Sequence, residues 1–131
     1  MRVDTRTCAV AGLSYAFQPI VDITNRLPYA YEALLRGARN EPAGVILGAL
    51  DEESIETIDK LARPRAIALA AQLGLGTRLH LNFQPRSLAS SNAVIEQTLA
   101  VAQRHGFDNE QVVLEVTETQ VIDDQRRFAD A

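Results

Sequence analysis

The sequence has little that would link it to a membrane, a nucleic acid or an oxidising compartment. Cys8 is its one cysteine, which excludes an intramolecular disulfide framework and favours a reducing cytoplasm. The apolar runs fall far short of the roughly 20 residues that span a bilayer, and residues 1–14 lack the apolar core of a signal peptide. The net charge is −4 and the sequence has no Lys/Arg cluster, so we do not expect DNA or RNA as a partner.

The remaining composition is that of one globular domain. Hydrophobic residues make up 47% of the chain and charged residues 23%. A length of 131 residues is enough for one domain of ordinary size with a core. No internal repeat, low-complexity tract or linker divides the sequence. We therefore expect an N-terminal extension over residues 1–14 and a single domain over residues 15–131.

Two short strands are predicted at the start of this domain. Residues 15–22 are rich in aromatic and β-branched residues, and residues 28–35 follow after a short turn. So short a connection favours an antiparallel hairpin over a parallel crossover. Pro19 has no N–H to donate, which places the first strand at an edge, a start or a bulge.

Helices are predicted next. A short one is expected over residues 42–50, with Asn40 or Glu41 near its cap and Pro42 early in the helix. A longer one begins at a cap within residues 51–54. Pro64 predicts a kink or break just before it. The spacing i, i+3, i+4, i+7 predicts one apolar face on the longer helix, composed of Ala66, Leu69, Ala70 and Leu73, and the glycines that end it are Gly74 and Gly76.

The second half of the sequence alternates between strands and a helix. Residues 78–83 alternate strictly, which predicts a strand with Leu79, Leu81 and Phe83 on one face and His80 and Asn82 on the other. A helix over residues 92–105, with Ile95, Leu99 and Ala102 on one face and Gly106 as its stop, and a strand over residues 111–117 complete the order. After the hairpin this order is βαβαβ, which favours a parallel sheet. The fold class is therefore α/β, either half of a barrel or a small open sheet.

Three polar residues are predicted at the C-terminal ends of successive strands: Glu32, Asn82 and Glu115. Ligands and catalytic groups collect at this rim in parallel α/β folds. Oxygen ligands suit a hard cation, Mg²⁺ or Mn²⁺, rather than zinc. Each residue taken singly is as well explained as a hydrogen-bonded polar group, but three in register on successive strands favour a metal site.

Two histidines and the cysteine have simpler explanations. His80 shares a strand face with Asn82 but lies deeper, which favours a hydrogen-bonded core histidine over a base. His105 precedes Gly106 at a predicted helix end and is expected to interact with the last carbonyls there. Cys8 is expected to be an incidental thiol rather than a nucleophile.

Four motifs, in this order and at these intervals, make residues 15–130 resemble the EAL domain family. They are Phe17-Gln18-Pro19-Ile20-Val21, Glu32-Ala33-Leu34-Leu35-Arg36, Leu81-Asn82-Phe83 and Glu115-Val116-Thr117-Glu118. EAL domains are cyclic di-GMP phosphodiesterases, or inactive relatives that only bind the dinucleotide. Two further stretches resemble the subgroup found beside blue-light-sensing flavin domains: Arg36-Gly37, and Arg65-Ala66-Ile67 to Leu73-Gly74.

The resemblance implies a modified (β/α)₈ barrel whose first strand is antiparallel, of which this chain would be the N-terminal half. It implies that Glu32, Asn82 and Glu115 ligate the first metal ion, Mg²⁺ or Mn²⁺. Arg36 would contact a phosphate of cyclic di-GMP in a charge-assisted hydrogen bond. An ion pair between Arg36 and Glu32 is the alternative, although about 13 Å would separate them along a strand.

Two further roles follow from the resemblance. Gln18 would lie beside the bound dinucleotide. Glu118 would hold a loop that shapes the catalytic site and the dimer contact, without being a metal ligand. A homodimer, or association with a second half of the barrel, is the expected assembly.

The sequence also departs from a working enzyme. The second half of the family supplies an Asp-Asp-Phe-Gly segment, a lysine and a glutamate that complete the two-metal site. Asp123-Asp124 is followed by Gln125-Arg126, so we do not assign it that role. We expect hydrolysis of cyclic di-GMP to linear pGpG by the full domain and no activity from this chain alone. A degenerate EAL module that binds cyclic di-GMP or a partner protein, and a purely structural α/β domain, are the alternatives.

Overall fold

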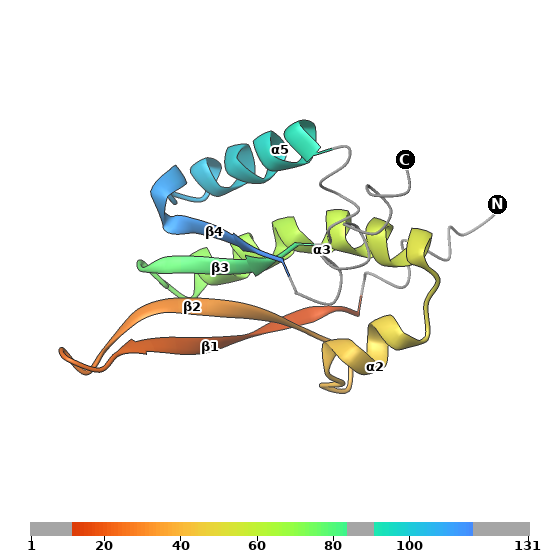
Figure 1. Cartoon of the computed structure of the whole chain (residues 1–131), viewed down its shortest axis with the longest axis horizontal. Coiled ribbons are helices and arrows are strands. Elements are labelled where there is room, and N and C mark those ends of the chain that lie inside the picture. Colours follow the sequence, from red (N-terminus) through yellow and green to blue (C-terminus); the bar gives the residue numbers. More distant parts are fainter. Residues whose placement is uncertain (1–11, 84–90, 117–131) are drawn as a thin grey trace, which may run out of the picture.

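The structure, a computed structural model, describes residues 12–83 and 91–116. Figure 1 shows how the elements follow one another. Their bounds are β1 Ser14–Asp22, β2 Leu27–Arg36, α2 Ala43–Gly48, α3 Glu52–Gln72, β3 Arg78–Asn82, α5 Ser91–Arg104, the 3₁₀ helix η1 Asn109–Gln111, and β4 Val112–Glu115. Among these residues no helix is both long and apolar enough to cross a membrane.

The sheet is mixed, as the sequence predicts. Its strand order is β1-β2-β3-β4, with β1 antiparallel to β2 and the other neighbours parallel. Pro19 lies on β1, which is an edge strand in the described part of the chain, and the register shifts next to it, between Ile20 and Val21. The hairpin and the parallel order are confirmed. The described strands form an open sheet, so closure into a barrel stays a prediction.

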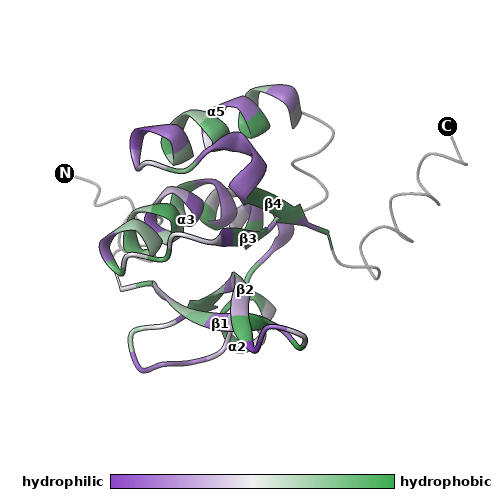
Figure 2. Ribbon diagram, turned by 90° about the vertical axis from the view of Figure 1, so that its left-hand side faces the viewer, coloured by the Kyte–Doolittle hydropathy of each residue, from purple (hydrophilic) through white to green (hydrophobic). Residues whose placement is uncertain are grey.

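Helices α3 and α5 cover one face of this sheet (Figure 2). Alternation along each strand sends one set of side chains toward these helices. On β3 that set is Leu79 and Leu81, which are buried together with Ala33 of β2. The helices contribute the other members of this core: Ala66, Ile67, Ala70, Val101, Ala102 and, just after α5, Phe107. The predicted apolar layer of β3 is therefore confirmed.

A second, smaller core lies under α2 and the start of α3. Ile58 and Ala62 of α3 are buried here with Leu13, and Leu47 of α2 packs against them. Tyr15 of β1 packs against both cores. This aromatic side chain therefore links the two clusters.

Helix α3 begins as predicted but buries a different set of residues. Asp51 is its N-cap and accepts a hydrogen bond from the Ser54 amide at 2.8 Å. The helix runs through Pro64 without a break. Leu73 is 63% exposed, so its place on the predicted apolar face is wrong. The cause is that α3 ends there: Leu73 is the C-cap, and the buried face lies one turn earlier.

Both long helices end in the same glycine-dependent motif. Gly74 has φ +70° and Gly106 has φ +88°, a conformation that glycine adopts without strain. After each glycine the next amide returns to the last turn, from Leu75 to the Ala70 carbonyl and from Phe107 to the Ala102 carbonyl. This is the Schellman arrangement, so Gly74 and Gly106 end their helices as predicted.

The cap of α2 differs from the prediction. Pro42, not Asn40 or Glu41, is the N-cap, and it makes no side-chain capping bond. Asn40 has φ +64° and belongs to the preceding turn, where its amide donates to the Gly37 carbonyl at 3.0 Å. The Glu41 carboxylate is used by the same turn, since it accepts from the Arg39 amide at 3.3 Å. Both predicted caps are therefore committed to the turn.

Candidate functional site

The face of the sheet opposite the two helices carries polar side chains. Register sets Gln18 beside Glu32, Glu32 beside His80, and Asn82 beside Glu115. Side chains of paired residues project from the same face of a sheet. The predicted metal ligands therefore lie on one face, together with Gln18 and His80.

Glu32 and Asn82 are in contact. The Asn82 Nδ2 donates to Glu32 Oε1 at 3.3 Å and lies 3.4 Å from the Ala33 carbonyl oxygen. Asn82 is exposed and Glu32 is half-buried. Two residues separated by fifty positions are thus brought together across β2 and β3.

Glu115 is held by a different residue. Its Oε1 lies 2.5 Å from the Nδ1 of His80, whose side chain is 15% exposed while that of Glu115 is 37% exposed. The prediction that His80 is a hydrogen-bonded, largely buried histidine is confirmed. Its partner was missed, because the contact joins residues far apart in sequence. The available signal was strand alternation, which puts His80 on the face of the predicted ligands.

The three predicted ligands are not level with one another. Asn82 and Glu115 are the last residues of β3 and β4, but Glu32 lies inside β2, which continues to Arg36. The reason is that β2 pairs with β3 only as far as Ala33 and continues along β1. Glu32 pairs with His80, one pleat below Asn82, so their contact is diagonal.

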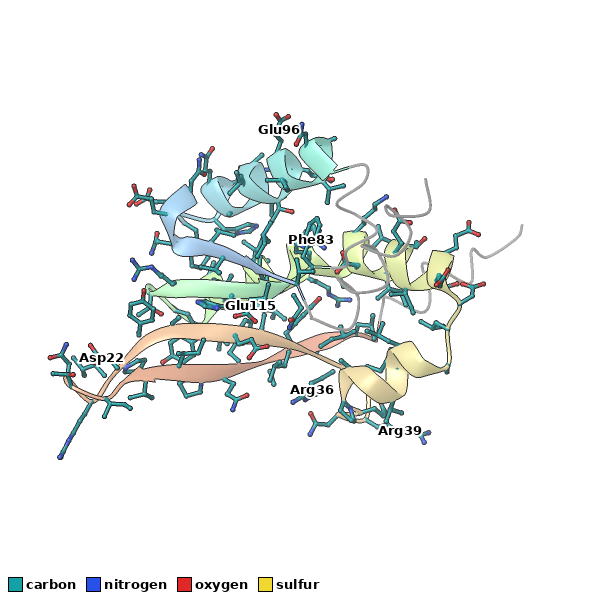
Figure 3. The ribbon with its side chains drawn as sticks, in the orientation of Figure 1. Asp22, Arg36, Arg39, Phe83, Glu96 and Glu115 are labelled. Atoms are coloured by element: carbon teal, nitrogen blue, oxygen red, sulfur yellow. The ribbon has the colours of Figure 1, made fainter. Side chains whose placement is uncertain are left out.

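Arg36 and Glu118 stand apart from this group. Arg36 ends β2, and its Nη1 donates to the Leu35 carbonyl at 2.9 Å. No ion pair joins Arg36 to Glu32, both of which the structure describes, in agreement with the distance expected along a strand. Figure 3 shows Arg36 at the end of β2 beside α2. Glu118 and Asp123-Asp124 lie outside the described residues.

The donor chemistry of the polar face suits a hard cation. Within residues 12–83 and 91–116 no group of three or more His, Cys, Asp and Glu side chains is arranged to hold a metal ion. The predicted set differs, because its third member is an amide: two carboxylates and the Asn82 side chain. Magnesium and manganese accept such oxygen ligands and take their remaining ligands from water and substrate.

A cavity of about 300 Å³ adjoins this group. Asn82 and Glu115 line it together with apolar residues of β2, α2 and α3. Besides Glu115, its charged members are Arg63 and Asp59 of α3, which form an ion pair. The Arg63 guanidinium also lies 4.4 Å from the ring centroid of Phe83, the residue labelled above the sheet in Figure 3.

Sequence reasoning missed this buried pair, although the spacing i, i+4 on a helix was its signal. Arg63 is only 4% exposed. Tyr15 lines the same cavity, and burial raises the pKa of its hydroxyl well above the ordinary value, with a further rise from the charge of Asp59. These three polar groups lie between the helices and the sheet.

Comparison with known proteins gives the following similarities. The sequence model of the EAL domain matches residues 5–131. BluF of Escherichia coli K12, a blue light- and temperature-regulated antirepressor, is 29% identical over 118 residues, which are 89% of this chain and 29% of BluF. The solved structure of a standalone versatile EAL protein from Vibrio cholerae O395, bound to c-di-GMP, has a TM-score of 0.72 at 38% identity and covers 79% of this chain and 44% of that one.

A second solved structure is BlrP1 of Klebsiella pneumoniae in complex with manganese and cyclic di-GMP. Its TM-score is 0.77 at 28% identity, over 91% of this chain and 30% of BlrP1. Another BlrP1 complex holds calcium. The EAL domain of Xanthomonas citri FimX, at 23% identity and a TM-score of 0.69, supports the fold alone. The chain therefore spans less than half the length of BluF, the Vibrio protein and BlrP1.

Proposed function

This chain belongs to the EAL domain family, and on that premise we propose that it is the N-terminal half of a cyclic di-GMP phosphodiesterase domain. The reaction of the complete domain would be metal-dependent hydrolysis of cyclic di-GMP to linear pGpG. The lone Cys8 supports a cytoplasmic location for it. The observation that carries the proposal is that Glu32, Asn82 and Glu115 lie on one face of the sheet, where Asn82 contacts Glu32 and is paired in register with Glu115.

In this proposal the three oxygen-bearing side chains hold one Mg²⁺ or Mn²⁺. The cation supplies activation of the attacking water and neutralises the charge that develops on the phosphate. Glu32 and Glu115 contribute negative charge, and Asn82 contributes a neutral oxygen once its amide turns from its present contact with Glu32. Relatives with cyclic di-GMP and manganese or calcium support a divalent cation here.

The remaining predicted residues bind or support the substrate. Arg36 gives up its bond to the Leu35 carbonyl and donates to a phosphate oxygen. Gln18, which is exposed beside Glu32, lies next to the dinucleotide. Glu118 holds a loop beside the site and is not a ligand.

We propose that this half does not hydrolyse cyclic di-GMP alone. The two-metal mechanism needs ligands for both cations, and the described polar face offers two carboxylates, Glu32 and Glu115, with the Asn82 amide between them. Pairing with a second half, or with another copy of this chain, would cover the edge of β4 that no strand of the described residues pairs with.

The first experiment incubates the chain with cyclic di-GMP and Mn²⁺ and measures pGpG by chromatography and binding by calorimetry. We expect Mn²⁺ binding without turnover. Robust turnover contradicts the inactivity of this half. Binding of cyclic di-GMP without hydrolysis, in the chain and in its mixture with the second half of an active relative, favours a degenerate module that only binds the dinucleotide.

The ligand assignment is tested by Glu32→Ala. Removal of one of the two carboxylates should abolish measurable Mn²⁺ binding, because it halves the negative charge that the site offers to the cation. The matched control is Glu96→Ala, since Glu96 is an exposed glutamate on α5, away from the sheet (Figure 3). Unchanged Mn²⁺ affinity in Glu32→Ala removes this residue from the site.

A further inference from the structure

The contact between His80 and Glu115 has a direction. A carboxylate can only accept hydrogen bonds, so the proton between the two atoms belongs to the His80 Nδ1, which donates to Glu115 Oε1 at 2.5 Å. The imidazole thus fixes one carboxylate oxygen. The other oxygen, Oε2, is left for a cation.

The opposite ring atom shows why a histidine occupies this position. The His80 Nε2 is buried and has no hydrogen-bond partner among the described residues. A buried polar atom without a partner is unfavourable, typically by about 1–3 kcal/mol. An apolar side chain would fill the same space without that penalty. What the imidazole adds is therefore its Nδ1 donor.

We propose that His80 is a positioning residue for Glu115, holding its carboxylate in the orientation that a divalent cation requires. This inference rests on the proposed metal site. A free glutamate must lose rotamer freedom when it ligates a metal, at a cost of up to about 2 kcal/mol. In this chain His80 imposes much of that order during folding. Partners of this kind, which contact a ligand rather than the metal, typically change metal affinity by about 10–100-fold.

The test uses two substitutions that differ in where they place a donor. In His80→Asn the amide nitrogen is bonded to Cγ, as Nδ1 is in histidine, so it can still donate to Glu115. In His80→Gln the amide lies one carbon further out. His80→Ala removes the donor, and His105→Ala is the control because the other histidine is exposed after α5.

Mn²⁺ affinity is measured by electron paramagnetic resonance of the free ion, beside the free energy of unfolding. We expect His80→Ala and His80→Gln to bind Mn²⁺ about 10–100-fold more weakly, and His80→Asn and His105→Ala to bind as the parent chain does. The Asn and Gln variants are compared directly with each other if the alanine variant does not fold. If His80 had only a structural role, both variants would lower the free energy of unfolding, and their Mn²⁺ affinities would not differ from each other.

The outcomes distinguish this inference from the proposed function. If the parent chain binds Mn²⁺ and the Gln variant binds equally well or more tightly, the role of His80 is overturned and the metal site stands. If Asn and Gln variants lose affinity equally, the Nδ1 donor is not the reason, and the inference is again overturned. If the parent chain binds no Mn²⁺, both the site and the positioning role fall.

Discussion

The two faces of the sheet use neighbouring residues for different purposes. On β3, Leu79 and Leu81 point into the helix-covered core and are buried, whereas His80 and Asn82 point to the other side. The first face stabilises the fold by removing apolar surface from water, which contributes about 25 cal/mol for each Å² buried. The second holds contacts between polar groups that are partly in water, where net gains are near 1 kcal/mol each. Stability and chemistry are thus separated within a single strand.

Arg63 is an exception to this division between an apolar and a polar face, because it is charged and lies on the apolar side. Its ion pair with Asp59 is almost fully removed from water. We expect Arg63→Met to lower the free energy of unfolding by about 3–5 kcal/mol, since the substitution leaves the Asp59 carboxylate without its arginine. Urea unfolding followed by circular dichroism measures the change.

The control is the double variant Arg63→Met with Asp59→Leu, which removes both charges. It should recover much of the loss, because an apolar pair of similar volume often replaces a buried ion pair without penalty. A loss below about 1 kcal/mol in the single variant would mean that the pair is hydrated and that the two faces differ less than described.

Leu81→Ala tests the apolar face directly. Leu81 is 2% exposed, so its truncation should cost about 2–5 kcal/mol in unfolding free energy. Its matched partner is Asn82→Ala, the next residue on the opposite face, which should cost only about 1 kcal/mol because its hydrogen bonds to Glu32 and Ala33 are long and partly exposed to water. Equal losses in chemical denaturation would show that both faces stabilise the fold to the same extent.

Tyr15 gives the smallest effect, and it depends on pH. Burial raises the pKa of its hydroxyl above the ordinary value of about 10. Below pH 10 the hydroxyl is neutral in both states, so its contribution is fully present. Above pH 10 the unfolded state loses the proton first, so the free energy of unfolding should fall by up to about 1.4 kcal/mol per pH unit. Unfolding measured from pH 8 to 11 checks this.

Tyr15→Phe is the control for that titration. It removes the hydroxyl and keeps the ring between the two cores, so the loss above pH 10 should become shallower. Identical pH dependence in both chains would place the Tyr15 hydroxyl in contact with water. The apolar face would then be more hydrated than its buried aliphatic side chains indicate.

Local rules predicted the hairpin, the parallel strands and the helix ends. Three residues carry these signals in their own covalent structure. Pro19 lacks a backbone N–H, Asp51 has a capping carboxylate and Gly106 lacks a Cβ. The resemblance to the EAL family is likewise confirmed, and BluF, a blue light-regulated protein, is among the relatives, as the predicted subgroup implies.

Contacts between distant residues were not predicted. The pairing of His80 with Glu115 depends on the register of two parallel strands, which no local pattern specifies. Leu73 has the right helical spacing for burial, but spacing does not reveal that the helix leaves the sheet at that residue. Before α2, Asn40 and Glu41 make hydrogen bonds within the turn that begins at Gly37, so Pro42 is the N-cap in their place. The first two outcomes depend on tertiary context, and the third on a local turn that competes with the helix cap.

Gly74 and Gly106 end the two long helices in a backbone conformation with positive φ, which depends on the handedness of the residue. A Cβ added at Gly74 or Gly106 would meet no atom within 4 Å, so space is not what restricts these positions. The restriction is the positive φ, which disfavours an L residue and suits its mirror image. A D-amino acid at either glycine would keep the helix-to-strand geometry and reduce the freedom of the unfolded chain. The turns that carry α3 into β3 and α5 toward β4 are thus defined by the positive φ of these two residues.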